Sequence, residues 1–97
     1  SAPLPSSNFS MTQKMIDFSP KLDLRGKRAE EVIQILGDFL DNAVLLNHKD
    51  LAIVHGKGDG ILRQVVRDFL RKYREVRHME DEHADRGGAG VTLVTLG

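Results

Sequence analysis

A glycine-rich segment that carries one lysine comes directly before a helical pattern, and this arrangement is typical of an anion-binding site. Gly56, Gly58 and Gly60 alternate with Lys57 and Asp59. Glycines let the backbone approach a phosphate closely, and the helix that follows offers unpaired N–H groups and a positive dipole. The spacing matches neither a Walker loop nor a dinucleotide fingerprint. The alternative interpretation is a tight turn in which the Asp59 carboxylate caps the helix.

Two charged pairs are expected to lie close to this segment. Asp23 and Arg25 stand at the end of one predicted strand, and His55 ends the next strand, two residues before Lys57. The carboxyl ends of parallel strands meet at one edge of an open α/β sheet, where ligands collect. The sequence therefore predicts that these four residues lie near one another, although about thirty residues separate the two pairs.

A row of arginines continues along the predicted helix after the glycines. Arg63, Arg67, Arg71 and Arg74 fall within roughly 80° of one another on a 3.6-residue repeat. Residues 57–77 hold seven basic and three acidic side chains, a net charge of +4. A ridge that follows the phosphates of a nucleic acid is one interpretation, and salt bridges to nearby acids are the other. We take Arg63, Arg67 and Arg71, together with the three glycines, as candidate phosphate-binding residues.

The hydrophobic pattern predicts the elements that must position these side chains. In chain order they are strands at 22–25, 51–55, 76–80 and 91–96 and helices at 29–45 and 62–73. The order β-α-β-α-β-β predicts a small two-layer α/β sandwich with a four-stranded mixed sheet. Each strand–helix–strand crossover should give parallel neighbours, and the last two strands should form a hairpin. Alternation places Val76, His78 and Glu80 on one side of the third strand.

Composition limits the possible classes of protein. With 97 residues there is room for one domain, and the absence of cysteine excludes disulfides, zinc fingers and cysteine nucleophiles. Fourteen basic residues balance fourteen acidic ones. No apolar run is long enough to cross a membrane, and no export signal is visible. Residues 1–20 are predicted to be a flexible linker or a cloning remnant, and residues 21–97 the folded domain.

The remaining histidines are weaker candidates for a site. His83 lies among Glu80, Asp81, Glu82 and Asp85. This group fits either a hard-cation cluster or a mobile acidic loop, and its spacing matches no metal motif.

Three short segments resemble the motifs of the Smr (small MutS-related) domain. They are Leu22–Gly26, which reads LDLRG, His55–Gly58, which reads HGKG, and Gly87–Thr92, which reads GGAGVT. The resemblance covers residues 21–96, with the motifs in the family's order and spacing. With Arg25 in the first motif, the chain is most similar to the Smr module at the C-terminus of the second-type bacterial MutS homologue. Many stand-alone Smr proteins have histidine at that position.

The resemblance implies a fold, an activity and a set of site residues. The fold is that of the C-terminal domain of translation initiation factor three. The activity is that of an endonuclease, expected to nick DNA with a preference for branched or structured substrates. The alternatives are a DNA-, RNA- or ribosome-binding module without chemistry, and a protein-interaction domain. The catalytic residues implied are Asp23, Arg25, His55 and Lys57, with Gly56 and Gly58 shaping the loop.

These residues suit hydrolysis of a phosphodiester, which needs an activated water, charge stabilisation on phosphorus and a protonated leaving group. His55 is expected to act as general base or acid. Asp23 would orient His55 or hold one divalent ion, and Arg25 and Lys57 would stabilise the charge on phosphorus. One carboxylate at this edge is too few for two-metal catalysis. Arginine at position 25 also leaves a mechanism with two histidines without its second imidazole.

The resemblance also implies a cellular context. It suggests Mg²⁺ or Mn²⁺ as cofactor, with ATP bound only by other domains of the parent protein. The parent is expected to be a homodimer that suppresses recombination and acts on branched DNA or, in some bacteria, on collided ribosomes. The isolated domain is expected to be a monomer that binds DNA, or RNA, in the bacterial cytoplasm at the nucleoid or the ribosome, away from the membrane.

Overall fold

The structure is a computed structural model that describes residues 17–97. Its elements follow the predicted β-α-β-α-β-β order, with two short 3₁₀ turns before the last strand. They are β1 (Lys21–Asp23), α2 (Ala29–Leu45), β2 (Asp50–Val54), α3 (Ile61–Lys72), β3 (Val76–Asp81), η1 (Ala84–Arg86), η2 (Gly88–Gly90) and β4 (Val91–Leu96). Each boundary lies within two residues of the predicted one, because the apolar positions change period sharply at glycine or polar residues.

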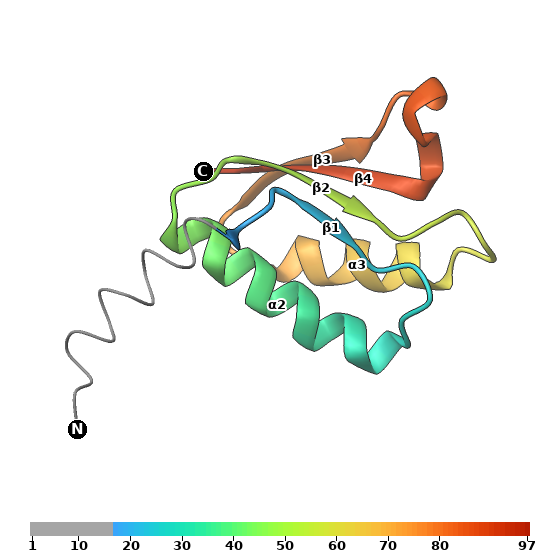
Figure 1. Ribbon diagram of the computed structural model, residues 1–97, viewed down its shortest axis with the longest axis horizontal. Coiled ribbons are helices and arrows are strands. Elements are labelled where there is room, and N and C mark those ends of the chain that lie inside the picture. The colour runs from blue at the N-terminus through green and yellow to red at the C-terminus, as the bar shows by residue number, and fades with distance from the viewer. Residues whose placement is uncertain (1–16) are drawn as a thin grey trace.

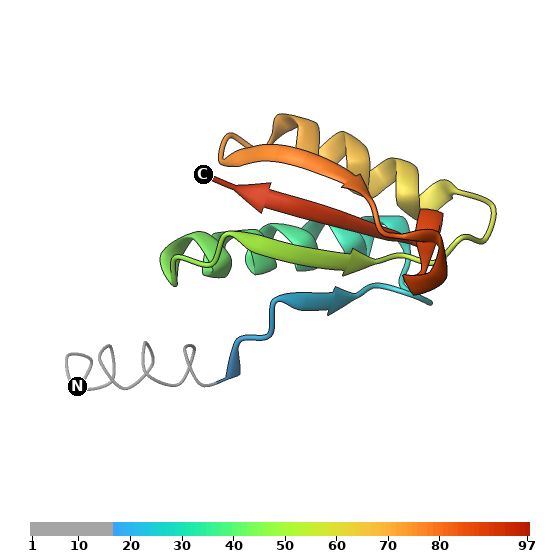
Figure 2. The same cartoon turned by 90° about the horizontal axis from the view of Figure 1, so that it is seen from above.

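The four strands form one mixed sheet in the order β1-β2-β4-β3, which can be followed from blue to orange in Figure 2. β1 runs parallel to β2, while β4 is antiparallel to both β2 and β3. The mixed sheet and the final hairpin are confirmed. The expectation that both crossovers give adjacent parallel strands is wrong for β2 and β3, because β4 lies between them. β4 is buried at four of its six positions, which fits a strand inside the sheet.

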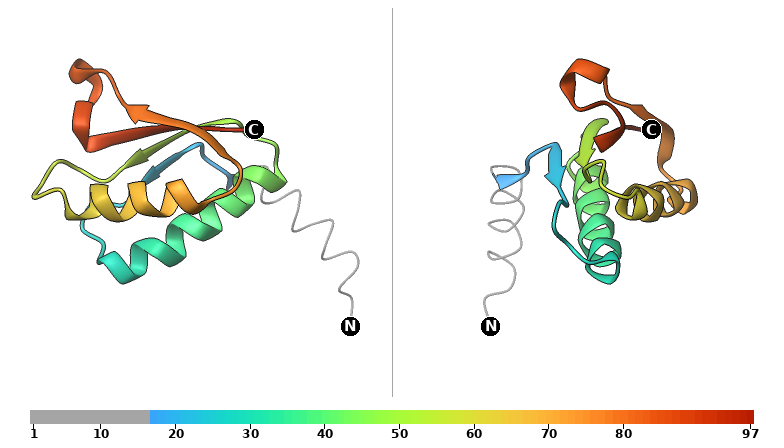
Figure 3. Two further views of the ribbon diagram at one scale, coloured as in Figure 1. Left: turned by 180° about the vertical axis from the view of Figure 1, so that it is seen from behind. Right: turned by 90° about the vertical axis from the view of Figure 1, so that its right-hand side faces the viewer.

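Both helices cover the same face of the sheet, as the end-on view in Figure 3 shows. The core lies between the two layers. It contains aliphatic residues from α2, β2, α3 and β4 and the residue that follows β1, among them Leu24, Leu36, Leu40, Ile53, Val66, Leu70 and Val94. No described residue covers the other face of the sheet (Figure 1). Inward and outward positions on the strands are therefore distinct, and this distinction divides the candidate site.

A β-bulge in β3 changes the side on which its residues lie. The register shifts between Val76, which pairs with Leu96, and His78, which pairs with Thr95. Val76 and Met79 pack against the core, whereas His78 is exposed. The prediction that Val76 and His78 share one side is therefore wrong, because the extra residue of a bulge inverts the alternation.

The loops that follow β1, β2 and β3 all lie at one end of the molecule, together with the first turns of both helices (Figure 1). The C-terminus lies at the opposite end. This arrangement brings the three motif-bearing loops, 25–28, 55–60 and 82–90, to one end of the molecule.

The predicted linker at residues 1–20 lies mostly outside the described residues. Of its final residues, Phe18 stacks on Phe39 with ring centroids 5.3 Å apart. The carbonyl of Pro20 accepts a hydrogen bond from the N–H of Ala52 at 2.9 Å. Contacts with the domain therefore extend back to Phe18. Among the described helices, none is both long and apolar enough to cross a membrane.

Candidate functional site

The peptide group of Gly56 is the place where the three predicted motifs touch. The Nδ1 atom of His55 lies 2.9 Å from the Gly56 carbonyl oxygen. The N–H groups of His55 and Gly56 both donate to the Gly90 carbonyl, at 3.0 and 2.9 Å. A Cβ atom on Gly56 would lie 3.5 Å from Cγ of Arg25, and its φ of +79° favours glycine. The second and third motifs are therefore hydrogen-bonded to each other at this loop, and the first motif lies beside it.

Gly90 supports this loop at short range. A Cβ atom built on Gly90 would lie 3.3 Å from three atoms: the carbonyl carbon of Gly56 and the N and Cγ atoms of Lys57. That spacing is tighter than an ordinary contact, and two of the three neighbours are backbone atoms that cannot turn aside. The third motif needs a glycine here so that η2 can approach the loop 55–58.

We expect Gly90→Ala to destabilise the domain by about 1–3 kcal/mol, the usual cost of adding a methyl group to a filled space. The measurement is the free energy of unfolding in urea, with Ala89→Ser at the exposed neighbouring position as control. Equal stability of the Gly90→Ala variant and the control would show that the loop does not depend on this contact.

Asp23 and Arg25 form an exposed ion pair on the open face of the sheet. Arg25 donates from Nε to Oδ1 of Asp23 at 3.0 Å and from Nη2 to Oδ2 at 2.6 Å. The hydrogen bonds from Arg25, including one from its backbone N–H, lower the pKa of Asp23 to about 2. Asp23 is therefore a carboxylate at neutral pH and a weak base. Its main contact is with the Arg25 guanidinium, which it holds in place.

His55 lies on the other face of the sheet, among the core residues. Its side chain follows the inward positions Leu51 and Ile53, and the residue is 4% exposed. Asp23 pairs in register with the outward position Val54. The four predicted residues do gather at one edge, but the sheet separates Asp23 and Arg25 from His55, and Asp23 and His55 are not hydrogen-bonded to each other.

Both ring nitrogens of His55 are bonded to protein groups. Nε2 lies 2.8 Å from Oγ1 of the fully buried Thr92, and that oxygen also accepts a hydrogen bond from Nε of Arg67 at 3.2 Å. Burial is the main cause that lowers the pKa of His55, and the charges of Arg63 and Arg67 act in the same direction. The Gly56 carbonyl opposes this shift, as does Asp81. The ring is therefore neutral at physiological pH.

The stability of the domain should depend on pH through His55. Because its pKa is lower in the folded chain than in the unfolded chain, the unfolded chain binds the proton more tightly. The stabilisation is complete above about pH 6.5 and is lost as the pH falls below that value. Urea unfolding at pH 7.5 and at 5.5, compared between the wild type and His55→Asn, measures the effect. An equal loss of stability in both proteins would assign it to other groups.

The predicted arginine ridge consists largely of ion pairs. Arg63 and Arg67 both bind the carboxylate of Asp81, the former at 2.9 Å. Arg71 binds Asp68 at 2.7 Å in the adjacent turn. The side chain of Arg67 is only 15% exposed, against 58% for Arg71. Arg67 is thus fixed inside the domain, while Arg71 remains accessible to solvent.

The loop after β2 keeps several donors free. Gly60, the helix N-cap, has a φ of +85°, and the Asp59 carboxylate accepts the N–H of Ile61 at 3.2 Å, so the predicted turn and cap exist. The backbone N–H groups of Lys57, Gly58 and Asp59 donate to no group among residues 17–97. The exposed ammonium of Lys57 likewise has no ion-pair partner there. This end of the molecule therefore combines a fixed backbone with unused donors.

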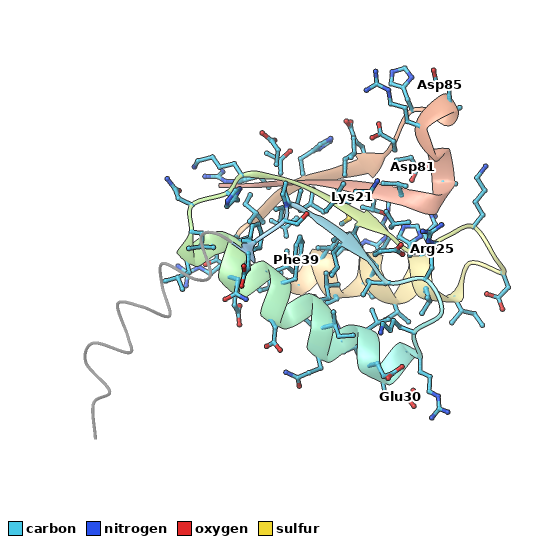
Figure 4. The ribbon with its side chains drawn as sticks, in the orientation of Figure 1. Lys21, Arg25, Glu30, Phe39, Asp81 and Asp85 are labelled. Carbon is cyan, nitrogen blue, oxygen red and sulfur yellow. The ribbon has the colours of Figure 1, made fainter. Side chains whose placement is uncertain are left out.

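The described residues around the loop 55–60 offer few ligands for a metal ion. Within residues 17–97, no group of three or more histidine and carboxylate side chains is placed to hold a metal ion. Asp23 is the carboxylate at the open edge, and both of its oxygens bind Arg25. His83 lies 3.8 Å from Asp85, and both side chains are 83% exposed at the tip of the β3–β4 connection, where Figure 4 labels Asp85. The donor sets among residues 17–97 do not fit Mg²⁺ or Mn²⁺.

Two contributors to the site were not assigned roles from the sequence. Thr92 occurs in the third motif, but the apolar run 91–96 does not reveal which threonine faces inward. Asp81 stands in an acidic stretch whose members look alike. In Figure 4, Asp81 and Arg25 lie toward the same end of the molecule. Thr92 faces inward, as Val94 and Leu96 do. This can be recognised only when the register of β4 in the sheet is known.

A protein-family model described as the Smr domain matches residues 22–97. The chain is similar to endonuclease MutS2 of Streptococcus pyogenes serotype M5 (strain Manfredo), with 46% identity over 77 residues, which cover 79% of this chain and 10% of that protein. It is also similar to endonuclease MutS2 of Streptococcus agalactiae serotype Ia, with 40% identity over 94 residues, covering 95% of this chain and 12% of that protein. The chain thus spans about a tenth of the length of these curated relatives.

Two solved structures share the fold. The Smr domain of Thermus thermophilus MutS2 superposes with a TM-score of 0.77 at 38% identity, covering 79% of this chain and 96% of that one. YdaL, a stand-alone small MutS-related protein from Escherichia coli, superposes with a TM-score of 0.76 at 25% identity, covering 79% of this chain and 63% of that one.

Proposed function

The chain belongs to the Smr domain family, and on that basis we propose that it is a nucleic-acid-binding endonuclease module that nicks DNA. The proposal is supported by the loop 55–60, which hydrogen bonds of the second and third motifs hold at Gly56, and whose Lys57 and N–H groups of residues 57–59 have no partner among residues 17–97. Backbone N–H groups at a helix start, with an added cation, are suited to a phosphate.

The residues around the loop have separate roles in this proposal. Lys57 and the free N–H groups of residues 57–59 bind a phosphate of the nucleic acid and stabilise the charge that develops on phosphorus. Arg25, held by Asp23, provides a second positive charge at the same edge, next to Gly56. We also propose branched or structured DNA as the preferred substrate, because the family resemblance implies it.

Proton transfer is the part of the reaction for which the described residues offer the least. Asp23 is a weak base because its pKa is about 2. Nε2 of His55 is bonded to Thr92, and it could accept a proton from a substrate only after that bond is broken. RNA would reduce this demand, since its 2′-hydroxyl is an internal nucleophile.

These observations favour a second candidate function, a module that binds DNA, RNA or a ribosome without cleaving it. The same loop would then bind phosphate, and the absence of a free base among residues 17–97 near it would be of no consequence. On the family resemblance alone, we propose that the domain belongs to a longer, dimeric MutS-type protein that suppresses recombination, and that ATP binds to other domains of that protein.

Turnover separates the two candidates. The purified chain is incubated with supercoiled plasmid, with and without Mg²⁺ or Mn²⁺, beside Lys57→Ala prepared in the same way to detect contaminating nuclease. Conversion of plasmid to relaxed circles by the wild type, and its loss in the variant, is the result expected of a nicking enzyme. Binding of the plasmid without conversion under all conditions would contradict the endonuclease proposal and leave the binding module.

A further inference from the structure

A directed chain of hydrogen bonds connects α3 to the loop 55–60 through the interior. The Gly56 carbonyl can only accept, so the proton on the ring of His55 must be on Nδ1, 2.9 Å away. In the neutral ring Nε2 is then an acceptor, and the hydroxyl of Thr92 donates to it at 2.8 Å. Nε of Arg67 can only donate, and it does so to the Thr92 oxygen at 3.2 Å. In this series of hydrogen bonds, a single assignment of donors and acceptors satisfies all three bonds.

The alternative protonation states leave a group without a partner. A proton on Nε2 would point at the Thr92 oxygen, and the Thr92 hydroxyl proton would then need another acceptor inside the core. Thr92 is 0% exposed and His55 is 4% exposed, so bulk water does not supply that acceptor. The charged groups that face the ring are Arg63, Arg67 and Asp81, and Asp81 already binds both arginines. The surroundings therefore favour a neutral ring with its proton on Nδ1.

We propose that Thr92 is a positioning residue of the phosphate-binding loop, because its hydroxyl fixes His55 as the neutral Nδ1–H tautomer that holds the Gly56 carbonyl. His55 then acts through the loop and does not exchange a proton with the substrate. The tautomer is a property of the folded chain alone, whereas the effect on cleavage rests on the function proposed above.

The tautomer is measured by nitrogen NMR of the histidine rings in the uniformly labelled chain. We expect the wild type to show His55 with a protonated Nδ1 and an unprotonated Nε2. Thr92→Ser, which keeps the hydroxyl, should retain this pattern. Thr92→Val, which keeps the shape and removes the hydroxyl, should change the Nε2 resonance and the backbone amide resonances of residues 56–58. Thr95→Val, the same change at an exposed position of the same strand, should alter neither.

A protonated Nε2 in the wild type would overturn the proposal, even if Thr92→Val fails to fold. Unchanged resonances of His55 and of residues 56–58 in a folded Thr92→Val would overturn it as well. Both readouts are independent of nuclease activity, so a chain that does not cleave plasmid still tests the role of Thr92.

Plasmid nicking tests the second half of the proposal through His55 itself. The amide of asparagine can donate to the Gly56 carbonyl in place of Nδ1–H, but it cannot transfer a proton. We expect His55→Asn to keep at least about a tenth of the wild-type rate. The rate of His55→Ala should fall below that of His55→Asn. Equal loss of cleavage in both variants, with both folded and both binding plasmid, would show that His55 exchanges a proton with the substrate.

Discussion

Replacement of Lys57 by alanine is expected to lower the rate of plasmid nicking by about 100-fold or more, the usual effect of removing one group that stabilises transition-state charge. Lys57 is exposed, and its ammonium forms no ion pair with any of residues 17–97. The loop that carries it is held by backbone contacts at Gly56 and Gly90, so the variant should fold normally. The measurement is the initial rate of conversion of supercoiled plasmid to relaxed circles.

Lys72→Ala is the matched control for this result, because Lys72 is also exposed but lies in the last turn of α3, away from the loop. It removes the same charge from the chain and should leave the rate within about twofold of the wild type, since exposed charges far from a site act weakly. Equal rates for Lys57→Ala and the wild type would show that the phosphate does not bind at this loop.

The second large effect is on stability, and it distinguishes two arginines of the predicted ridge. Arg67→Ala should destabilise the domain by about 2–3 kcal/mol, because it removes charge-assisted hydrogen bonds to Asp81 and Thr92 from a side chain that is only 15% exposed. Arg71→Ala should change the free energy of unfolding by less than about 0.5 kcal/mol, since the Arg71–Asp68 pair is open to solvent.

Nucleic-acid binding should show the opposite order. Arg71→Ala should weaken binding of duplex DNA and reduce the dependence of the binding constant on salt, as expected when a phosphate contact is lost. The affinity of Arg67→Ala for DNA is measured well below the unfolding temperature of the variant. It should fall only to the extent that the loss of Arg67 disturbs the loop 55–60. A stable Arg67→Ala with greatly weakened binding would make Arg67 a direct phosphate ligand and contradict its structural role.

The elements of this fold could be predicted from the sequence because their patterns are clean. In α3 the apolar residues Leu62, Val66 and Leu70 recur at helical spacing, and the two helices and the four strands are found where the pattern places them. The order of the strands in the sheet was harder to predict from the sequence. Local pattern does not show that β4 folds back between β2 and β3, because this depends on how the hairpin packs against the whole sheet.

The bulge in β3 is also invisible in the sequence. Residues 76–81 alternate plausibly without it, and the shift after Val76 reflects pairing with β4. The prediction for His78 failed because a single extra residue reverses the faces of everything that follows.

The sequence predicts which residues come together at this edge of the sheet, but it does not predict their geometry. The carboxyl ends of β1 and β2 do meet, so Asp23, Arg25, His55 and Lys57 gather at one edge. What the sequence did not show is the face on which each lies. Residues 51–55 are nearly all apolar, so their inward phase is hidden, and a polar His55 within that run looks as accessible as Asp23.

Backbone amide resonances test whether phosphate binds at the loop 55–60. Inorganic phosphate and then a short DNA duplex are titrated into the labelled chain, and the backbone N–H resonances are followed residue by residue. We predict that the largest changes occur at Lys57, Gly58 and Asp59 and that they are lost in Lys57→Ala. Changes concentrated on the open face of the sheet, with residues 57–59 unaffected, would contradict the assignment of this loop as the phosphate site.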